Sequence, residues 1–420
     1  MLFSGRKRPR TVNIDLLRHW LRLCHSGHEN LCAQLEHDNP QARRIRRIRF
    51  IDLKDLCVRT LEDFDHTQRG HEYVALSYVW GSPKQATLTS ENIYILGQTG
   101  ELTKQCLPQT ISDAIQLVQL LGFRFLWVDA LCIIQNDDGD KSEQIGNMSQ
   151  VYGLAFLTII AACGTNSMSG LAGLRPGTRS FEQREVVVIP PGTGSAGLSL
   201  LTTCESHQTG FWSPSGSDFE LSAWNSRGWT LQELAMSRRC LIFTRHQALW
   251  SCGGGFFCEE SRFEHPLLDP DVKNTAPFSM PIRFALYSVG NVLTTQRING
   301  TMSRFITSSE QFWDKYNRLV QNFTFRQFSF NGDRYDGFRG IEDALHQISG
   351  EEFYWGHPRS RFEFSLSWVP EYGLHRNDDK TTLPITSLNQ RVSFPSWSWM
   401  GWIGRVSCSV RSVRSVRLAR

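Results

Sequence analysis

The chain has 420 residues, of which 40% are apolar and 11% aromatic, so it can bury a sizeable core and is not intrinsically disordered. Its net charge is only +4, and residues 51–404 carry 29 basic against 37 acidic groups, which excludes a nucleic-acid-binding domain with a basic face. No run of 18 apolar residues occurs, which excludes a transmembrane helix. Eleven cysteines without a C-x-x-C pair indicate a reducing compartment, so we expect a cytoplasmic protein.

The first predicted element is an amphipathic helix that docks on a core. Its stripe, with intervals of three and four, consists of Ile14, Leu17, Leu21, Cys24, His28, Leu31 and Leu35. Cys24, His28 and Cys32 would present two thiols and an imidazole on one face, as zinc requires. A structural zinc site needs a fourth ligand, and the same residues equally fill the seam of the packed helix. We favour the packing interpretation and predict no metal site.

Residues 73–162 alternate between predicted strands and helices. Strands are predicted at 73–79, 93–96, 125–128 and 156–162. One helix is predicted to begin with Thr110 as N-cap and Asp113 in a capping-box-like position, and to end at Gly122. A second helix is predicted, whose core-facing residues are Ile145, Met148, Tyr152 and Ala155. This alternation predicts an α/β fold with a mostly parallel sheet flanked by helices.

The remaining segments are less regular. Residues of about 180–220, rich in Gly, Ser, Thr and Pro, are predicted to form a loop insertion. A short helix capped by Asn225 or Ser226 follows and runs through Leu234, and then a hairpin pairs 240–243 with 248–252. Helices are predicted near 312–320 and 341–348 in a region of mixed structure. The repeated Ser-Val-Arg triplets near the end predict a disordered tail.

Five sequence blocks resemble the fungal heterokaryon incompatibility (HET) domain in order and spacing. They are YVALSYVWG (73–81), LPQTISDAI (107–115), LGFRFLWVDALCIIQND (121–137), QIGNMSQVYGLAFLTIIAA (144–162) and RGWTLQE (227–233). We therefore expect a HET domain at 46–265 with its motif core at 73–233. It follows an N-terminal basic segment with a docking helix (1–45) and precedes a mixed C-terminal region (266–404) and a basic tail (405–420).

The resemblance implies an effector of vegetative incompatibility, which triggers programmed cell death on non-self recognition in a filamentous fungus. It also implies an incompatibility partner protein, which it does not identify, and self-association is a further possibility. The family resembles TIR domains distantly, and because some of these cleave NAD, an NAD glycohydrolase is the alternative. The chain has no G-x-x-x-x-G-K-[ST] loop and no internal repeat, so it resembles a stand-alone form. A degenerate or truncated member, suggested by the repetitive tail, is a second alternative.

Two carboxylates are the catalytic candidates. Asp129 follows the apolar run 125–128, so we expect it at the carboxyl end of a buried strand, where α/β sheets bind ligands. It would hold a ribose or act as a base, or else cap the following turn. Glu233 would stabilise the oxocarbenium-like centre of an NAD glycohydrolase, or else form an ion pair with Arg227 or Arg238. An active site requires Asp129 and Glu233 to face one cleft.

Four further residues are ligand-binding candidates: Ser77, Trp80, Arg227 and Trp229. The planar guanidinium of Arg227 suits phosphate, and the Trp80 and Trp229 rings suit stacking on a base or a nicotinamide. We favour a core role for both tryptophans. Ser77 and Cys132 are nucleophiles by residue type only, since neither has a recognisable catalytic partner in the sequence. The sequence therefore predicts neither a serine nor a cysteine hydrolase.

Overall fold

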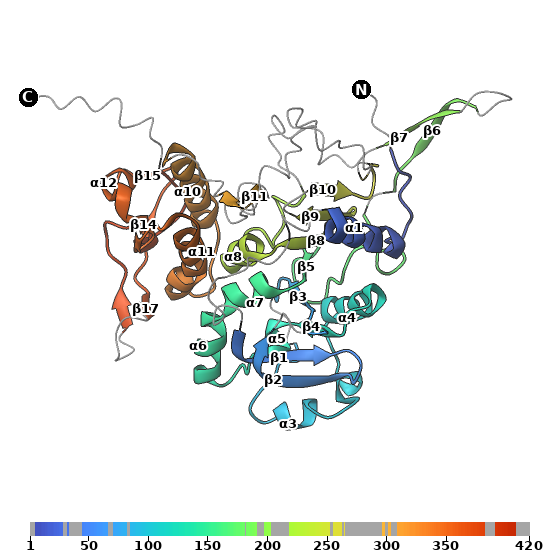
Figure 1. Cartoon of the computed structure of the whole chain (residues 1–420), viewed down its shortest axis with the longest axis horizontal. Coiled ribbons are helices and arrows are strands. Elements are labelled where there is room, and N and C mark those ends of the chain that lie inside the picture. The colour runs from blue at the N-terminus through green and yellow to red at the C-terminus, as the bar shows by residue number, and fades with distance from the viewer. Residues whose placement is uncertain are drawn as a thin grey trace, which may run out of the picture. The chain divides into compact units, whose positions relative to one another are not determined.

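The computed structural model describes residues 5–27, 32, 44–65, 70–81, 85–180, 182–190, 197–202, 218–252, 255–262, 264, 296–298, 301–303, 309–382 and 391–408. The chain divides into two compact units (Figure 1). The first unit contains Met1–Trp224 and Ser237–Leu286, and the second contains Asn225–Met236 and Tyr287–Arg420. The motif core predicted at 73–233 therefore contributes to both units. None of the helices among the described residues is long and apolar enough to cross a membrane.

An eight-stranded mixed sheet forms the core of the first unit, in the order β10-β9-β8-β5-β3-β4-β1-β2. Its strands are β1 (Arg44–Asp52), β2 (Cys57–Asp65), β3 (Tyr73–Ser77), β4 (Phe125–Trp127), β5 (Leu157–Ala161), β8 (Arg239–Phe243), β9 (Ala248–Cys252) and β10 (Gly255–Cys258). The four central strands β8, β5, β3 and β4 are parallel, and an antiparallel pair continues the sheet at each side. Every residue of the four parallel strands is buried, as expected for strands covered on both faces. The predicted α/β class is confirmed, as is the hairpin of β8 and β9.

Helices cover both faces of this sheet (Figure 1). They are α1 (Ile14–Gly27), α3 (Ile93–Leu96), α4 (Gln109–Leu121), α5 (Asp129–Cys132), α6 (Asp138–Gly146) and α7 (Met148–Leu154). The chain moves from β3 to its neighbour β4 through α4, then back past β3 to β5 through α6 and α7. Since such crossovers are right-handed, the two opposite moves place α4 on one face and α6 with α7 on the other. Helix α1 docks as predicted, with its Trp20 and Cys24 side chains fully buried.

The predicted strand at 93–96 is wrong, because these residues form the single helical turn α3. The Asn92 side chain accepts a 2.8 Å hydrogen bond from the N–H of Thr89, which folds the chain just before this turn. Four apolar residues are too few for their spacing to distinguish a strand from one turn of helix.

The predicted start of α4 is also wrong. Pro108 is the N-cap residue, and Thr110 lies inside the helix. The Thr110 hydroxyl accepts a 3.0 Å hydrogen bond from the N–H of Gly170, and Asp113 accepts one of 2.8 Å from the N–H of Leu171. These side chains hold the loop after β5 instead of capping their own helix. The predicted end is confirmed, since Gly122 adopts a left-handed φ of 91°.

The helix predicted through Ile145 and Ala155 is two helices, α6 and α7, which meet at Asn147. The Asn147 N–H donates to the carbonyl of Gln144 at 3.1 Å, which closes α6. Met148, Tyr152 and Ala155 are buried as predicted, whereas Ile145 is half-buried.

Two further predictions need correction. Within the predicted loop insertion, β6 (Glu185–Ile189) and β7 (Leu198–Leu201) form an antiparallel hairpin. Residues 191–196 and 203–217 of that insertion lie outside the described part of the chain. The predicted disordered tail starts too early, since β20 (Val406–Ser407) pairs with β15 (Val369–Pro370) and Val406 is fully buried. Residues 409–420 lie outside the described residues.

The second unit is built on helices α8 (Trp229–Met236), α10 (Ser309–Thr324), α11 (Arg334–Ser349) and α12 (Phe362–Ser365). Helix α8 begins at Trp229, so neither predicted cap, Asn225 or Ser226, stands next to its first turn. Both helices predicted near 312–320 and 341–348 are confirmed as α10 and α11. The other strands are β11 (Gln296–Ile298), β12 (Thr301–Ser303), β13 (Phe353–Tyr354), β14 (His357–Pro358), β16 (His375–Arg376), β17 (Lys380–Thr382), β18 (Arg391–Ser393) and β19 (Trp402–Ile403). Aromatic rings dominate its core, including Phe323, Phe338 and Trp399.

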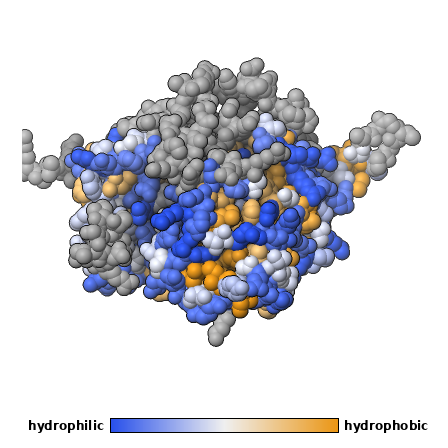
Figure 2. All heavy atoms as spheres, turned by 60° about the horizontal axis from the view of Figure 1, so that its bottom comes forward, coloured by the Kyte–Doolittle hydropathy of each residue, from blue (hydrophilic) through white to orange (hydrophobic). Residues whose placement is uncertain are grey.

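In the coloured part of the face shown in Figure 2, hydrophilic residues predominate, with hydrophobic residues exposed in a patch between them. Among the described residues, consecutive exposed apolar side chains gather on the hairpin of β6 and β7. Its exposed apolar residues are Val186, Val187, Val188, Ile189, Leu198 and Leu200. Large exposed apolar patches often mark interaction sites.

Candidate functional site at the carboxyl edge of the parallel strands

The carboxyl ends of β3 and β4 bring Trp80 and Asp129 together. Ser77 ends β3 and leads through a short segment to Trp80, while Asp129 begins α5, with Val128 between it and β4. The indole Nε1 of Trp80 donates a 2.7 Å hydrogen bond to Oδ2 of Asp129. This is the edge of a parallel sheet at which α/β folds bind their ligands, as predicted for Asp129.

The Asp129 carboxylate is half-buried and fixed in orientation. Its Oδ1 accepts a 2.7 Å hydrogen bond from the N–H of Ala130, in the first turn of α5. Gln135 Nε2 donates to the backbone carbonyl of Asp129 at 3.0 Å, which closes the turn that follows α5. The capping interpretation and the ligand interpretation are therefore compatible, because one carboxylate offers about four acceptor positions.

A buried ion pair supports the loop that carries Asp129. The guanidinium of Arg49 in β1 donates two hydrogen bonds to the carboxylate of Asp140, from Nη1 to Oδ2 at 2.9 Å and from Nη2 to Oδ1 at 2.7 Å. Arg49 Nη1 also donates to the carbonyl of Cys132, and Asp140 accepts from the N–H of Ile134 at 2.8 Å. Burial disfavours the charged form of Asp140 and so raises its pKa. The hydrogen bonds from Arg49 and Ile134 have a larger combined effect, so the pKa lies below its ordinary value. Sequence analysis missed this pair, because the two residues lie 91 positions apart.

The hydroxyl of Ser77 serves the packing of the first unit. It is buried and accepts a 2.6 Å hydrogen bond from the indole Nε1 of Trp224, which is itself fully buried. Burial raises the pKa of the Cys132 thiol to about 12, so this thiol stays protonated near neutral pH. The expectation that neither residue makes this chain a serine or cysteine hydrolase stays a prediction, as does ligand binding by Ser77.

Glu233, Arg227 and Trp229 belong to the second unit, in or just before α8. Asp129 belongs to the first unit. That Glu233 and Asp129 face one cleft therefore stays a prediction. Glu233 is buried, and its charge stabilises the buried guanidinium of Arg326. Burial nevertheless lowers the pKa of Arg326 to about 9. Sequence analysis considered Arg227 and Arg238 as partners of Glu233 and missed Arg326.

Arg326 also fastens the backbone of the RGWTLQE block. It donates to the Arg227 carbonyl at 3.1 Å, to the Thr230 hydroxyl at 2.7 Å and to Oδ1 of Asn225 at 2.6 Å. A parallel bridge between Arg227 and Gln327 adds backbone pairing. These contacts give the block a structural role in the second unit, since they order both its loop and the first turn of α8.

Trp229 is half-buried beside two residues of the second unit. Its ring packs edge-on against Phe328, with centroids 6.4 Å apart, and its indole forms a hydrogen bond with Asp333. Burial raises the pKa of Asp333, and the hydrogen bond from Trp229 lowers it in part. The favoured core role of Trp229 is consistent with these contacts.

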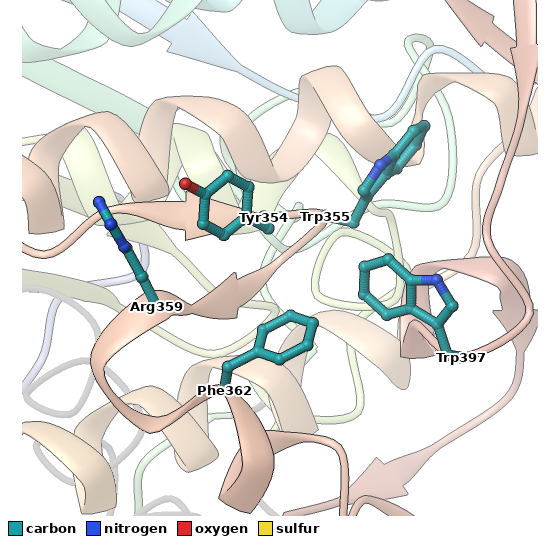
Figure 3. A pocket seen from close by; sticks show the side chains of 5 residues that line it. All are labelled: Tyr354, Trp355, Arg359, Phe362 and Trp397. Atoms are coloured by element: carbon teal, nitrogen blue, oxygen red, sulfur yellow. The ribbon is translucent and has the colours of Figure 1, made fainter.

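The second unit also contains an aromatic cavity of about 450 Å³ (Figure 3). It is lined by Tyr354, Trp355, Arg359, Phe362 and Trp397, none of which is among the predicted site residues. The turn between β13 and β14 consists of Trp355 and Gly356, with φ of 51° and 86°. A tryptophan in the left-handed region costs about 1–3 kcal/mol, so the surrounding packing must hold it there. Aromatic faces beside a guanidinium suit a planar or apolar group.

The thiols considered as zinc ligands are drawn together from distant parts of the first unit. The Sγ atoms of Cys24, Cys32 and Cys252 all lie within 4.8 Å of one another. His28, the imidazole in the same sequence pattern, lies outside the described residues. Sequence analysis missed Cys252, which ends β9, because no local pattern connects it with α1.

Comparison with known families matches residues 73–233 to the model of the heterokaryon incompatibility protein (HET) family. Comparisons with curated proteins and with solved structures give no match. The matched segment starts at the first residue of β3 and ends within α8. It contains all six predicted site residues, which are Ser77, Trp80, Asp129, Arg227, Trp229 and Glu233. The chain therefore carries a HET domain over residues 73–233, the domain of a family that is associated with heterokaryon incompatibility.

Proposed function

We propose that this chain is an effector of heterokaryon incompatibility, which triggers programmed cell death on non-self recognition in the cytoplasm of a filamentous fungus. The observation that carries the proposal is the HET domain at residues 73–233. It includes three of the four parallel strands and the edge at which Trp80 meets Asp129. We take that edge as the functional centre of the domain.

An NAD glycohydrolase is the second candidate. It is favoured by the position of Asp129, a half-buried carboxylate at the carboxyl end of a parallel strand and next to an indole. In this proposal NAD is the substrate, Asp129 holds its ribose hydroxyls and Trp80 contacts a ring. Nicotinamide leaves the ribose carbon, and water then bonds to the same carbon. A carboxylate stabilises the oxocarbenium-like centre that exists between these two steps. Glu233 is the proposed second carboxylate.

We propose that the effector also self-associates or binds its incompatibility partner through the hairpin of β6 and β7. Val186 and Val187 in β6 are 58% and 55% exposed, and Leu200 in β7 is 54% exposed. Among the described strands, β6 pairs only with β7 and β7 only with β6. The outer edges of this hairpin therefore offer backbone N–H and C=O groups to which a further strand can add.

The proposal is tested by inducible expression of the full chain in a filamentous fungus, with colony counts as the readout and total cellular NAD measured in parallel. Asp129→Asn removes the charge and keeps the shape. Asp138→Asn, an exposed aspartate in the first turn of α6, is the matched control. Wild type and Asp138→Asn are expected to kill.

The behaviour of folded Asp129→Asn separates the two candidates. Loss of both killing and NAD consumption would establish the enzyme. Killing without NAD loss in wild type and in Asp129→Asn would show that the effector acts by assembly with partners. A folded wild-type chain that leaves viability unchanged would instead favour the degenerate family member.

A further inference from the structure

The three buried thiols of the first unit are arranged as metal ligands. Cys24 lies in α1, Cys32 follows that helix in the chain, and Cys252 ends β9. Cys24 and Cys32 are 0% and 1% exposed, and Cys252 is half-buried. Their Sγ atoms lie within 4.8 Å of one another, so one point in space is within reach of all three.

This spacing fits a tetrahedral metal better than a disulfide. With Zn–S bonds of about 2.3 Å, two thiolates on one tetrahedral zinc stand about 3.8 Å apart, within the observed limit. A disulfide would bring two sulfurs to about 2.0 Å and leave the third thiol without a partner. None of the three forms a disulfide with another described residue.

Positive charge surrounds the sulfurs, as a cluster of thiolates requires. Arg239 Nε donates to Sγ of Cys24 at 3.2 Å, although this arginine is only 5% exposed and its guanidinium stacks over Phe156. The neighbouring Arg238 is half-buried, and it interacts electrostatically with Cys24 and Cys32. Buried cations are costly without counter-charge. Three thiolates on a divalent ion carry a net charge of about −1, which a single guanidinium balances.

We propose that Cys24, Cys32 and Cys252 bind a zinc ion, which fastens the N-terminal helix to β9, the strand next to the edge strand β10. Its thiols are held within packed elements, and two of them are completely buried, so the ion would stabilise the fold. A water molecule would complete the tetrahedron beside the half-buried Cys252. Zinc lies outside the centre at Trp80 and Asp129, so this proposal stands independently of the proposed function. Sequence analysis favoured a packing role for Cys24 and Cys32. In this proposal the same two side chains pack against the first unit and also bind the metal.

The same region contains direct contacts that the metal would reinforce. The indole Nε1 of Trp20 donates to Glu264 at 2.8 Å, and Arg6 forms a 2.7 Å ion pair with the same carboxylate. Trp20 also packs on Phe257 of β10, with ring centroids 6.2 Å apart. Loss of the metal is therefore expected to loosen the N-terminal helix before the central sheet.

The test is elemental analysis of the full chain, expressed in zinc-supplemented medium and purified under reducing conditions without chelator. We expect about one zinc ion per chain. Cys24→Ala, Cys32→Ala and Cys252→Ala are each expected to lose the ion. Cys240→Ala, which removes an equally buried thiol from the adjacent strand β8, is expected to retain it.

Two measurements on wild type keep the test decisive if a variant fails to fold. Exchange of the metal for Co²⁺ is expected to give the absorption bands of thiolate-to-cobalt charge transfer, and a chelator is expected to lower the unfolding temperature until zinc is restored. A folded wild-type chain without zinc or cobalt bands would overturn the proposal. So would zinc retained in all three cysteine variants, or a disulfide between any two of these residues in the reduced preparation.

Discussion

The indole Nε1 of Trp80 donates a 2.7 Å hydrogen bond to Oδ2 of Asp129, and so joins the chain beyond β3 to the start of α5 beyond β4. Strands β3 and β4 are neighbours in the parallel centre of the sheet, so the bond connects two loops at one edge. The carboxylate that is best placed for ligand binding is thereby held by an aromatic ring from the same HET domain.

Trp80→Phe is expected to lower the free energy of unfolding by about 1–2 kcal/mol, because it removes the donor to a charged acceptor and keeps an aromatic ring. Urea denaturation measures this loss. Trp397→Phe changes a ring in the second unit that is 42% exposed, and is expected to have a smaller effect. Equal stability of Trp80→Phe and wild type would show that the hydrogen bond contributes nothing to folding.

Replacement of Arg49 by Met is expected to destabilise the first unit by about 3–5 kcal/mol, because it leaves the buried carboxylate of Asp140 without its partner. The double variant Arg49→Met/Asp140→Leu removes both charges and is expected to recover part of the loss. Thermal unfolding of the three proteins decides this. No recovery in the double variant would mean that the lost contacts to Cys132 and Ile134 matter more than the charge.

The second unit is expected to become less stable as pH rises from about 5 to about 8. Burial raises the pKa of Glu342 to about 8, so the folded unit holds a proton that the unfolded chain releases. The protonated Glu342 contributes its full stabilisation below the ordinary glutamate pKa, and this contribution is lost as the pH rises to the pKa of the folded state. The loss amounts to about 5 kcal/mol of the free energy of unfolding.

Glu342→Gln removes the titrating group and is expected to flatten this pH dependence. The matched control is Glu363→Gln, an exposed glutamate in the first turn of α12. Chemical denaturation, followed by tryptophan fluorescence at several pH values, provides the comparison. A slope in Glu342→Gln as steep as that of wild type would assign the pH dependence to other groups.

Val187→Lys and Leu200→Lys, on the two strands of the exposed hairpin, are expected to reduce self-association of the full chain by at least about tenfold, because each places a charge on an apolar contact surface. Sedimentation velocity over a range of concentrations measures the change. Ile95→Lys is the control, since this residue is 50% exposed on α3, away from the hairpin in the sequence. If wild type sediments as a monomer throughout, the hairpin does not mediate self-association.

Much of the fold could be predicted from the sequence, because buried parallel strands appear as short apolar runs. The runs at 73–79, 125–128 and 156–162 contain β3, β4 and β5. Amphipathic spacing likewise identified α1, α4, α10 and α11. The failures occurred where local patterns are too short or too polar: four apolar residues did not reveal the turn α3, and a Gly- and Ser-rich composition concealed β7.

The candidate site could be predicted only in part. A carboxylate directly after a buried strand identified Asp129, but its contact with Trp80 depends on strand pairing across 49 positions. Arg326 reaches the RGWTLQE block from about 100 residues further along the chain, and Cys252 joins two thiols near the N-terminus. Such partners have no local signal, because only the topology of the sheet and the fold of the second unit bring them together.

Colony counts after induced expression of the full chain test the central claim most directly. The complete chain is needed, since Val406 is part of the buried core of the second unit. We predict that wild type and Asp138→Asn reduce viability by at least about tenfold relative to an empty vector. Unchanged viability, with the folded protein present at the same level, would contradict the assignment of this chain as a cell-death effector.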